Sequence, residues 1–410
     1  MAIPDKVLEL HAEMSEWRRD LHAHPETAFE EQRTSAVVAQ RLESFGLVVR
    51  RGLGRTGVVG TLSAGSGKRA IGLRADMDAL HILEKNDFAH RSQHEGKMHA
   101  CGHDGHTAML LGAAKYLSAS RNFDGTVHFI FQPAEENEGG GREMVEQGLF
   151  EEFPCEAVYG MHNWPGIPVG QFGWRAGPTM ASFDIFEIEL TGRGAHAALP
   201  HTGIDPIVAA AALVQVLQTI ASRNADPVEP AVVSVTQVHA GDTWNVIPDS
   251  AVVRGTTRAF RPEVQDMLER RVREICAGIA SAHGVQVKVR YERRYPPLIN
   301  AAPEAAICAA VIQEMVGADN IVHVPPTMGA EDFAFMLQAK AGCYVFIGNG
   351  PGAGGCLLHN PHYDFNDQIL PLGASYWTNL VEHILAVPAE ISAPFTQRPP
   401  ASRGVNRPIP

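Results

Sequence analysis

The sequence predicts an α/β fold in which a mostly parallel β-sheet is interrupted by an inserted, smaller α+β unit. In the first and last thirds of the chain, apolar segments typical of buried strands alternate with amphipathic helical segments. In the middle third, polar and apolar residues alternate instead, as in strands with one exposed face. The chain of 410 residues also exceeds the size of one ordinary hydrophobic core, so we expect two domains.

The first third begins with two amphipathic helices. One is expected over residues 6–22 and ends at the break "HPET"; the other is expected over 31–45 and ends at Gly46. The segments expected next are strands "LVVRRGL" at 47–53, "GVVGTLS" at 57–63 and "AIGLRADMD" at 70–78, a helix at 106–120, and the strand "TVHFIFQP" at 126–133. Such apolar strands are typical of a sheet that helices cover on both faces.

The middle third has the order strand, helix, strand, strand, helix, strand. Its segments are "SFDIFEIELTG" at 182–192, a helix at 205–222 with Pro206 in its first turn, "PAVVSVTQVHAG" at 230–241, "SAVVRGTTRAF" at 250–260, a helix at 262–283 that Gly284 stops, and "VQVKVRYER" at 285–293. This order is typical of ferredoxin-like units.

The last third returns to the α/β pattern. A helix is expected in "AICAAVIQEMVG" at 306–317, a strand in "CYVFIGNG" at 343–350 and a final helix over 374–385. The resulting divisions are a larger domain in two parts, 1–182 and 293–390, an inserted domain at 183–292, and a tail at 391–410. The tail is rich in proline and polar residues, so we expect it to be loose.

Composition argues against two classes of partner. The chain has 34 basic and 46 acidic side chains, a formal net charge of -12, whereas nucleic-acid binding needs a basic surface. The most apolar helical segment, residues 207–221, is shorter than a bilayer span, and the N-terminal residues lack the apolar core of a signal peptide. The six cysteines form no C-x-x-C pair. We therefore expect a cytoplasmic protein with reduced thiols and no nucleic-acid or membrane partner.

The stretch "HACGHDGHT" at 99–107 crowds metal-binding groups into a turn ahead of a helix. Cys101 and His103 are two residues apart, so both side chains can project to one side of an extended or turn segment and reach one metal ion. Taken alone, the run has an equally good structural interpretation, because single cysteines and loop histidines are usually structural.

Three further segments favour the metal hypothesis. Glu135 and Glu136 directly follow an apolar strand and precede a glycine-rich loop, where open α/β sheets place their sites. Because adjacent side chains leave the chain in different directions, one carboxylate can bind metal while the other faces a reacting water. His162 in "YGMHNWPG" and His359 in "CLLHNPHYDF" also follow apolar segments. Each of the three segments also has a structural interpretation without metal. The glutamates could lie in an exposed acidic loop, and His162 and His359 could be loop histidines with ordinary hydrogen bonds.

The ordered set of motifs resembles the M20 metallopeptidase family in its amidohydrolase branch. The motifs are "LRADMDAL", "HACGHDGHTAML", "QPAEE", "GMHNWP", "GAHAALPHTGIDP", "NVIPD", "GTTRAF" and "GAEDF". That branch includes hippurate hydrolases, N-acyl-amino-acid deacylases and auxin-conjugate hydrolases. The resemblance spans nearly the whole chain except its C-terminal end.

This resemblance implies a two-metal catalytic domain interrupted by a lid domain that also forms dimers. The ligands that it implies for two divalent ions per subunit are Cys101, His103, Glu136, His162 and His359. Imidazole, thiolate and carboxylate donors suit Zn²⁺ or Mn²⁺, with Co²⁺ and Ni²⁺ as further candidates. Glu135 matches the general base of the family, and His196 matches a lid histidine that reaches the partner's site. Asn245 and Arg258 match positions that hold the substrate's carboxylate.

Some positions depart from the family or lie outside the ligand set. Asp76 and Asp78 stand where other branches have a histidine ligand and its orienting aspartate, so we interpret both as groups that orient ligands. His81 replaces a proline that is usual in this branch, and it is expected to reshape the pocket rim. His22 and His24 are expected to act at a helix end.

The leading hypothesis is a metal-dependent amidohydrolase that cleaves small N-acyl- or N-aroyl-amino acids and forms a homodimer, or a dimer of dimers, through the lid. Alternatives within the class are a dipeptidase and an aminobenzoyl-glutamate-type hydrolase. A different class is a metal-bound protein that holds acyl-amino acids without cleaving them, although a binder has no use for Glu135 beside a ligand glutamate. A third class, a redox or structural zinc protein that uses Cys101, would need a second nearby cysteine.

Overall fold

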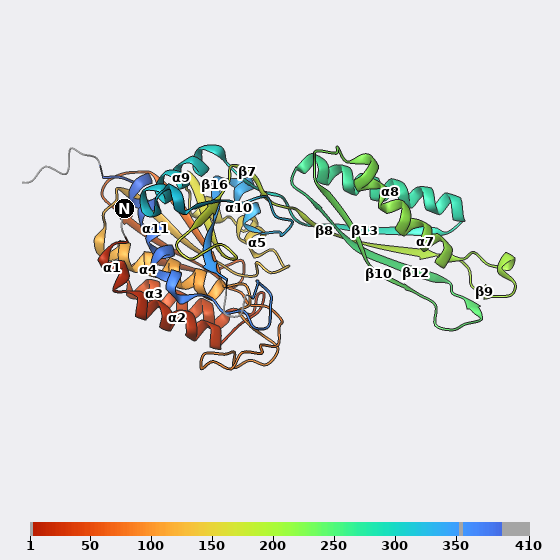
Figure 1. Cartoon of the computed structure of the whole chain (residues 1–410), viewed down its shortest axis with the longest axis horizontal. Coiled ribbons are helices and arrows are strands. Elements are labelled where there is room, and N and C mark those ends of the chain that lie inside the picture. The colour runs from red at the N-terminus through yellow and green to blue at the C-terminus, as the bar shows by residue number, and fades with distance from the viewer. Residues whose placement is uncertain (1–2, 352–355, 388–410) are drawn as a thin grey trace, which may run out of the picture.

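The computed structural model describes residues 3–351 and 356–387 and contains a large mixed sheet and a separate four-stranded sheet (Figure 1). The predicted tail, 391–410, lies outside the described residues. The large sheet has the order β1-β2-β4-β3-β5-β16-β6-β15. Its strands are β1 (Val48–Leu53), β2 (Gly57–Ala64), β3 (Ala70–Asp76), β4 (Gly125–Gln132), β5 (Ala157–Pro165), β6 (Phe172–Trp174), β15 (Ile321–His323) and β16 (Ala341–Gly350).

The centre of this sheet is parallel. β4, β3, β5 and β16 all run in one direction, while β1, β2 and β6 join through antiparallel pairs. The carboxyl ends of the four central strands therefore meet at one edge. The predicted fold class, α/β with a mostly parallel sheet, is confirmed.

Helices cover both faces of the large sheet. On one face, a hydrophobic cluster joins it to α1 (Asp5–Leu8), α2 (His11–Ala23), α3 (Gln32–Ser44), α4 (His103–Ser120), α9 (Ala302–Val316) and α11 (Leu370–Ile384). On the other face, a second cluster joins it to α5 (Gly140–Glu146), α6 (Leu149–Glu152) and α10 (Phe333–Ala339). Cover on both faces explains why the central strands are apolar throughout.

Several helix boundaries differ from the sequence prediction, among them the following three. The helix expected over 6–22 is broken into α1 and α2, because the Leu10 N–H bonds to Val7 O, three residues back, in a tight turn. α11 begins at Leu370 rather than at 374, with Pro371 in its first turn. α4 begins at His103 rather than at 106, so that His103 and His106 both lie on a helix.

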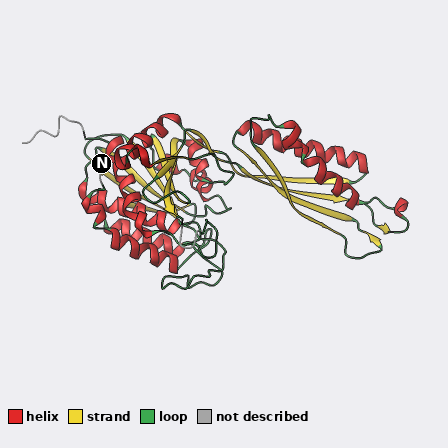
Figure 2. Cartoon of the chain, viewed as in Figure 1, coloured by secondary structure: helices red, strands yellow, loops and turns green. Residues whose placement is uncertain are grey.

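The four-stranded sheet is antiparallel, with the order β10-β12-β8-β13 (Figure 2). Its elements are β8 (Phe183–Thr191), α7 (Pro206–Leu217), β10 (Ala231–Ala240), β12 (Ser250–Ala259), α8 (Pro262–His283) and β13 (Gln286–Tyr295). α7 and α8 pack against it through one hydrophobic cluster. The short strands β9 (Ala195–His196) and β11 (Val246–Ile247) pair with each other, as do β7 (Gly177–Met180) and β14 (Leu298–Asn300).

One helical stretch, 206–224, is long and apolar enough to span a membrane by length and composition. A π-helical turn, Ile220–Asn224, continues α7 beyond the segment that we counted in the sequence. Leu213, Leu217 and Ile220 are nevertheless buried in the cluster against the four-stranded sheet. Core helices of globular proteins can have the same length and apolar composition, so the stretch is weak evidence for a membrane span.

Candidate metal centre

The carboxyl edge of the parallel strands gathers the five predicted ligands. Groups of their donor atoms lie within 4.8 Å of one another: one group is Cys101, His103 and His162, and another is Cys101, Glu136 and His359. Cys101 belongs to both groups. A third group adds Glu135 to His103 and Glu136. Segments far apart in sequence thus converge as expected for adjacent parallel strands.

A glycine shapes the turn that carries two of these donors. Gly102 has a φ of 97°, and a Cβ atom there would collide with the side-chain amide of Asn163. The turn lets Cys101 end the loop while His103 begins α4. Cys101 Sγ lies 3.4 Å from His162 Nε2.

His103 and His106 lie on the same helix but differ in their hydrogen bonds. His103 Nδ1 bonds to Asp78, at 2.9 Å from the backbone oxygen and 3.2 Å from Oδ1, while its buried Nε2 has no hydrogen-bond partner and lies 3.8 Å from Asp76 Oδ2. His106 uses both nitrogens: Nδ1 donates to Asp76 Oδ1 at 2.6 Å, and Nε2 accepts from the Asn163 N–H at 2.9 Å. Only His103 therefore has a nitrogen lone pair free for an ion.

The protonation states in the cluster follow from burial and charge. Burial, with the charges of Glu136 and Glu135, raises the pKa of the Cys101 thiol well above its usual value. Burial lowers the pKa of His162 well below its usual value, which keeps this imidazole neutral, the form that binds metal. Burial would also lower the pKa of His103, but the negative charges of Asp76 and Asp78 outweigh it and raise that pKa to about 10. A cation would compete with these protons.

His359 approaches the cluster from a strained loop. Its φ is 64°, its side chain is half exposed, and its Nε2 lies 3.1 Å from Glu136 Oε1. Left-handed backbone at a residue other than glycine is uncommon and concentrates at functional sites. The strain therefore fits a ligand presented at the mouth of the site.

Glu135 lies beside the ligand cluster in a backbone segment that is held at several atoms. Its carbonyl accepts a hydrogen bond from the Tyr295 hydroxyl, and the Glu136 N–H donates to Asp78 Oδ2 at 2.9 Å. The side chain is buried, and its carboxylate belongs to a group with Glu331 and Asp332. Burial, followed by the charge of Glu331, raises the pKa of Glu135 well above its usual range. A carboxyl group with a raised pKa is suited to proton transfer near neutral pH.

Asp78 occupies the orienting place that we expected, whereas Asp76 bonds to His106, which lies outside the predicted ligand set. Asp78 contacts both His103 and the Glu136 backbone, as described above. Asp76 holds His106 and pairs with buried Arg74 at 2.7 Å. Arg74 in turn binds Glu331 at 2.9 Å and Asp332 at 3.1 Å. Arg74 lies in the motif "LRADMDAL", and Glu331 and Asp332 lie in "GAEDF", but these motifs predicted no role for the three residues. His106 and Tyr295 were likewise not predicted as site residues.

An apolar wall faces the donor cluster. A cavity of about 280 Å³ contains Cys101, Glu135 and His162 and is closed by Trp164, Met180 and Leu358. The Trp164 ring packs edge-on against Phe346, with centroids 4.7 Å apart. The cavity thus joins metal donors to a fixed aromatic surface, which is typical of sites that orient a partly apolar ligand.

On its other side, Glu136 borders a cavity of about 510 Å³ that His81 and Arg55 also line. His81 is exposed and borders this neighbouring cavity but not the cavity that contains the donor cluster, so its effect on the substrate pocket stays a prediction.

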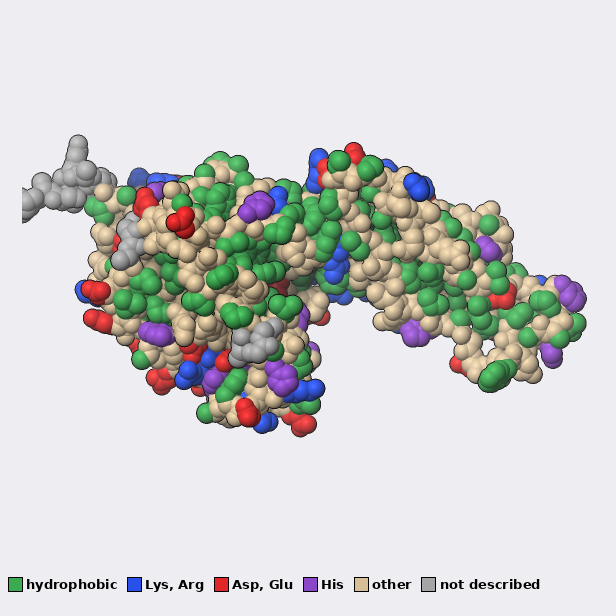
Figure 3. Space-filling view, viewed as in Figure 1, with side chains coloured by type: hydrophobic (Ala, Val, Ile, Leu, Met, Phe, Trp, Pro, Cys, Tyr) green, Lys and Arg blue, Asp and Glu red, His purple; other side chains and the backbone are tan. Residues whose placement is uncertain are grey.

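The lid residues lie away from the cluster. His196 and Asn245 are exposed, and β9 and β11 lie at the end of the four-stranded unit remote from the large sheet (Figure 1). The Ala198 N–H donates to His196 Nδ1 at 3.1 Å, so Nε2 carries the proton of the neutral ring and can donate it. Figure 3 shows histidine and hydrophobic side chains together at this end, where Trp244 and Leu199 are exposed.

Arg258 lies at the opposite end of the same unit. Its guanidinium is 4.1 Å from the centroid of the Phe183 ring, beside the start of β8. At about 3.3 Å per strand residue, Arg258 and Ser250, the first residue of β12, are about 26 Å apart, and Asn245 precedes Ser250. One chain therefore does not bring Arg258 and Asn245 together.

His22 and His24 lie at the end of α2 and are not in the donor cluster. His24 caps the helix, with Nδ1 2.8 Å from Asp20 O. His22 is buried between Asp104 and Glu84, at 2.9 and 3.2 Å. Burial alone would lower the pKa of His22, but these partners raise it to about 9.

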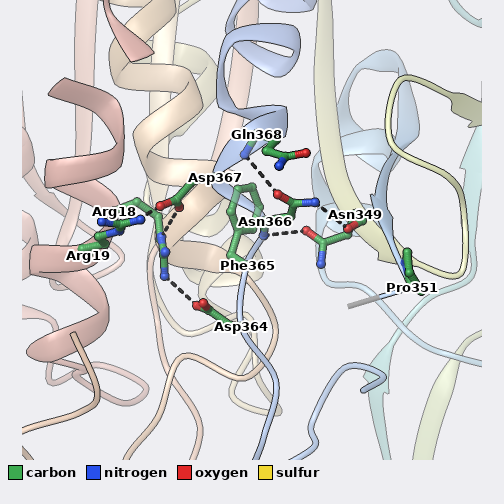
Figure 4. Close-up of a pocket in the computed structure, with 9 residues that line it drawn as sticks. All are labelled: Arg18, Arg19, Asn349, Pro351, Asp364, Phe365, Asn366, Asp367 and Gln368. Atoms are coloured by element: carbon green, nitrogen blue, oxygen red, sulfur yellow. Dashed lines mark hydrogen bonds and ion pairs between the residues drawn. The ribbon is translucent and has the colours of Figure 1, made fainter. Parts of the chain in front are cut away.

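A separate cavity of about 470 Å³ lies between α2 and residues 364–368 (Figure 4). Its charged groups are paired: Arg18 binds Asp364 and Asp367, and Arg19 binds Asp367. These pairs fix the segment that follows His359 against α2. The cavity shares no lining residue with the donor cluster.

Comparisons with known proteins show similarity over most of the chain. Residues 72–383 match the model of peptidase family M20/M25/M40. The chain is 42% identical to hippurate hydrolase of Campylobacter jejuni, over 93% of this chain and 98% of that one. It is 38% identical to the IAA-amino acid hydrolase ILR1-like 4 of Arabidopsis thaliana, over 93% and 89% of the two chains. It also resembles the crystal structure of a dinuclear metal binding peptidase of Bacillus subtilis from the M20 family, with a TM-score of 0.81, 34% identity and coverage of 92% and 99%.

Proposed function

We propose a reaction and a mechanism from one premise: the chain belongs to peptidase family M20/M25/M40. It is an amide-bond hydrolase that depends on divalent metal. The function that the site supports best is cleavage of N-acyl or N-aroyl amino acids into a carboxylic acid and a free amino acid. The observation that carries this proposal is the group of converging metal donors, of which Cys101, His103 and His162 are buried, with Glu135 beside it.

The donor set fits divalent transition metals. His103 Nε2, which has no hydrogen-bond partner, and the neutral His162 supply imidazole, Cys101 supplies sulfur, and Glu136 and His359 complete the set. We propose that these residues would hold two divalent ions, and that Zn²⁺ or Mn²⁺, or else Co²⁺ or Ni²⁺, would be used. When bound, such ions lower the pKa of a water molecule and polarise a carbonyl group.

The side chains of this protein then carry the proton and orient the substrate. Glu135 would accept the proton of the attacking water and return it to the leaving amine. Tyr295 holds the Glu135 carbonyl and Asp78 holds the Glu136 N–H, so the Glu135 side chain extends from a fixed backbone. The acyl group would lie against Trp164 and the other apolar residues of the cavity, where water is displaced.

A second copy of the chain would supply the remaining groups. His196 has an Nε2–H group that it can donate, and it is exposed at the end of the four-stranded unit that is remote from the donor cluster (Figure 1). We propose a homodimer, or a dimer of dimers, formed through the lid and working in the cytoplasm. In it, the partner's His196 would stabilise the oxyanion, and Arg258 with the partner's Asn245 would hold the substrate's carboxylate.

A substrate panel tests the proposed function. Protein reconstituted with Mn²⁺ or Zn²⁺ is assayed with N-acetyl, N-benzoyl and indole-acetyl amino acids, with dipeptides and with aminobenzoyl-glutamate. We expect turnover of acyl amino acids that a chelator abolishes. Faster cleavage of dipeptides or aminobenzoyl-glutamate would select one of those alternative hydrolases, and tight binding without any turnover would indicate a binding protein.

A further inference from the structure

We propose that Glu31 is a positioning residue for the reaction: its buried carboxylate holds the Ala134 backbone and so sets the direction in which Glu135 and Glu136 project. The proposal rests on the proposed function, because it concerns the glutamates that carry it. Glu31 lies in the loop between α2 and α3, far from the other site residues in sequence.

The Glu31 carboxylate joins three separate segments. Oε1 accepts hydrogen bonds from the Phe29 N–H at 3.0 Å and from the Ala134 N–H at 2.9 Å. Oε2 accepts one from the Thr56 hydroxyl at 2.7 Å. Phe29 belongs to the same loop, Thr56 to the β1–β2 turn and Ala134 to the end of β4. All four residues are at least partly buried, and Glu31 is fully so.

The joined segments are strained, which explains why they need an anchor. Phe29, Arg55 and Ala134 have φ values of 62°, 70° and 52°, three of the six positive values among the described residues other than glycine. Left-handed backbone at such residues persists only where the surroundings hold it. Phe29 and Arg55 also stack, with the guanidinium 4.0 Å from the ring centroid. Glu31 accepts hydrogen bonds from two of these residues, Phe29 and Ala134, and from Thr56, which follows Arg55.

The anchored residue immediately precedes the catalytic pair. The Ala134 N–H is held by Glu31, and its carbonyl accepts from the Gly140 N–H at 2.9 Å. A rotation of this peptide would turn Glu135 away from the donor cluster. By contrast, Asp78 holds the Glu136 N–H independently. Loss of the Glu31 contact should therefore disturb the base more than the metal ligands.

The position of the Glu31 oxygen that accepts the backbone N–H groups matters more for this contact than the charge of the side chain. Burial and the negative charge of Asp78 raise the pKa of Glu31 to about 7, against the hydrogen bonds that lower it. Near neutral pH the side chain is therefore often uncharged. Glutamine has the same length, its Oε1 can accept both backbone N–H groups, and its amide can donate to the Thr56 oxygen.

The experiment compares Glu31→Ala and Glu31→Gln with the control Glu26→Ala. Glu26 lies in the same loop and also accepts two backbone N–H bonds, from Arg33 and Thr34, but it does not contact the end of β4. We expect Glu31→Ala to lower kcat about 100-fold, since a displacement of about 1 Å costs that much, with KM and metal content nearly unchanged. Glu31→Gln and Glu26→Ala should stay within about threefold of the starting kcat, on the scale of one neutral hydrogen bond.

Amide hydrogen exchange over residues 131–138 gives a readout that is independent of turnover. Exchange at Ala134 should accelerate in Glu31→Ala and stay slow in Glu31→Gln and Glu26→Ala. If Glu31→Ala does not fold, Glu31→Asp, which is one methylene too short to reach both N–H groups, takes its place. Unchanged kcat and exchange in the shortened variants, or an equal loss of kcat in Glu26→Ala, would overturn the proposal. A starting protein that binds metal yet cleaves no acyl amino acid would instead refute the proposed function.

Discussion

The two ends of the site are built in opposite ways. At the carboxyl edge of the large sheet, Cys101, His103 and His162 are buried, close together and oriented by further side chains. At the far end of the four-stranded unit, His196 and Asn245 are exposed, on a short strand pair and its adjoining loop. The first region brings its donor atoms together within one chain, whereas His196 and Asn245 do not line the cavity of about 700 Å³ that lies beside them at Val246 and Pro248. In the dimer that we propose, metal binding would be a property of the subunit and turnover a property of the assembly.

Glu135→Ala gives the largest expected effect and tests the first region. A general base contributes about 10²–10⁴-fold, so we expect a loss of kcat of that size with metal content intact. Elemental analysis and steady-state kinetics measure the two quantities, with exposed Glu146→Ala on α5 as the control. Loss of metal in Glu135→Ala would mean that Glu135 and Glu136 have exchanged roles.

His196→Ala tests the second region. Removing one oxyanion donor costs about 10²–10³-fold in kcat, and metal content should not change. In the dimer that we propose the partner supplies this histidine, so mixing inactive His196→Ala and Glu135→Ala subunits should restore partial activity. His201→Ala, an exposed histidine at the same end, is the matched control. Verified mixed dimers that stay inactive would contradict an arrangement across subunits.

Cys101→Ser tests the metal donors of the first region. The thiol is shared by two donor groups, so the change should weaken retention of both ions. We expect at least the roughly 10–100-fold loss of affinity that changes around metal ligands cause. Titration with a competing chelator measures it, with Cys155→Ser as a buried control outside the donor groups. An unchanged metal stoichiometry and affinity would remove Cys101 from the ligand set.

Arg258→Ala gives the smallest expected effect, on substrate binding. A charge-assisted hydrogen bond contributes about 1.5–3 kcal/mol, so KM should rise roughly tenfold or more while kcat changes little. The control is Arg254→Ala on the same strand, where the side chain pairs with Glu187. Equal effects of the two substitutions would show that Arg258 acts through the stability of the sheet and not through the substrate.

Local sequence patterns predicted most of the fold but only part of the site. Apolar periodicity predicted most strands of the large sheet, although not the short strands β6 and β15. Glu136, which follows β4, was found because parallel strands end at one edge. His162 was expected after a short apolar strand and lies within β5 instead. The break between α1 and α2 was missed, because it depends on one tightened turn at Leu10 and leaves no mark in the periodicity.

The anchors of Glu135 could not be predicted in the same way. Glu31 contacts Ala134 across 103 residues of sequence, and Tyr295 contacts Glu135 across 160. Neither belongs to a periodic pattern or a motif with a local mechanism. Their positions follow only from the packing of distant loops, which the fold determines and the local sequence does not display.

The central claim is that the five donor side chains of one chain hold paired metal ions. Anomalous X-ray diffraction from crystals grown with Mn²⁺ or Zn²⁺ tests it most directly. The account predicts two anomalous peaks per subunit at the carboxyl edge of the large sheet, with Cys101 Sγ and His103 Nε2 at coordination distances of about 2.0–2.3 Å from an ion. Peaks bound by other residues, or none at this edge in an active crystal, would contradict it.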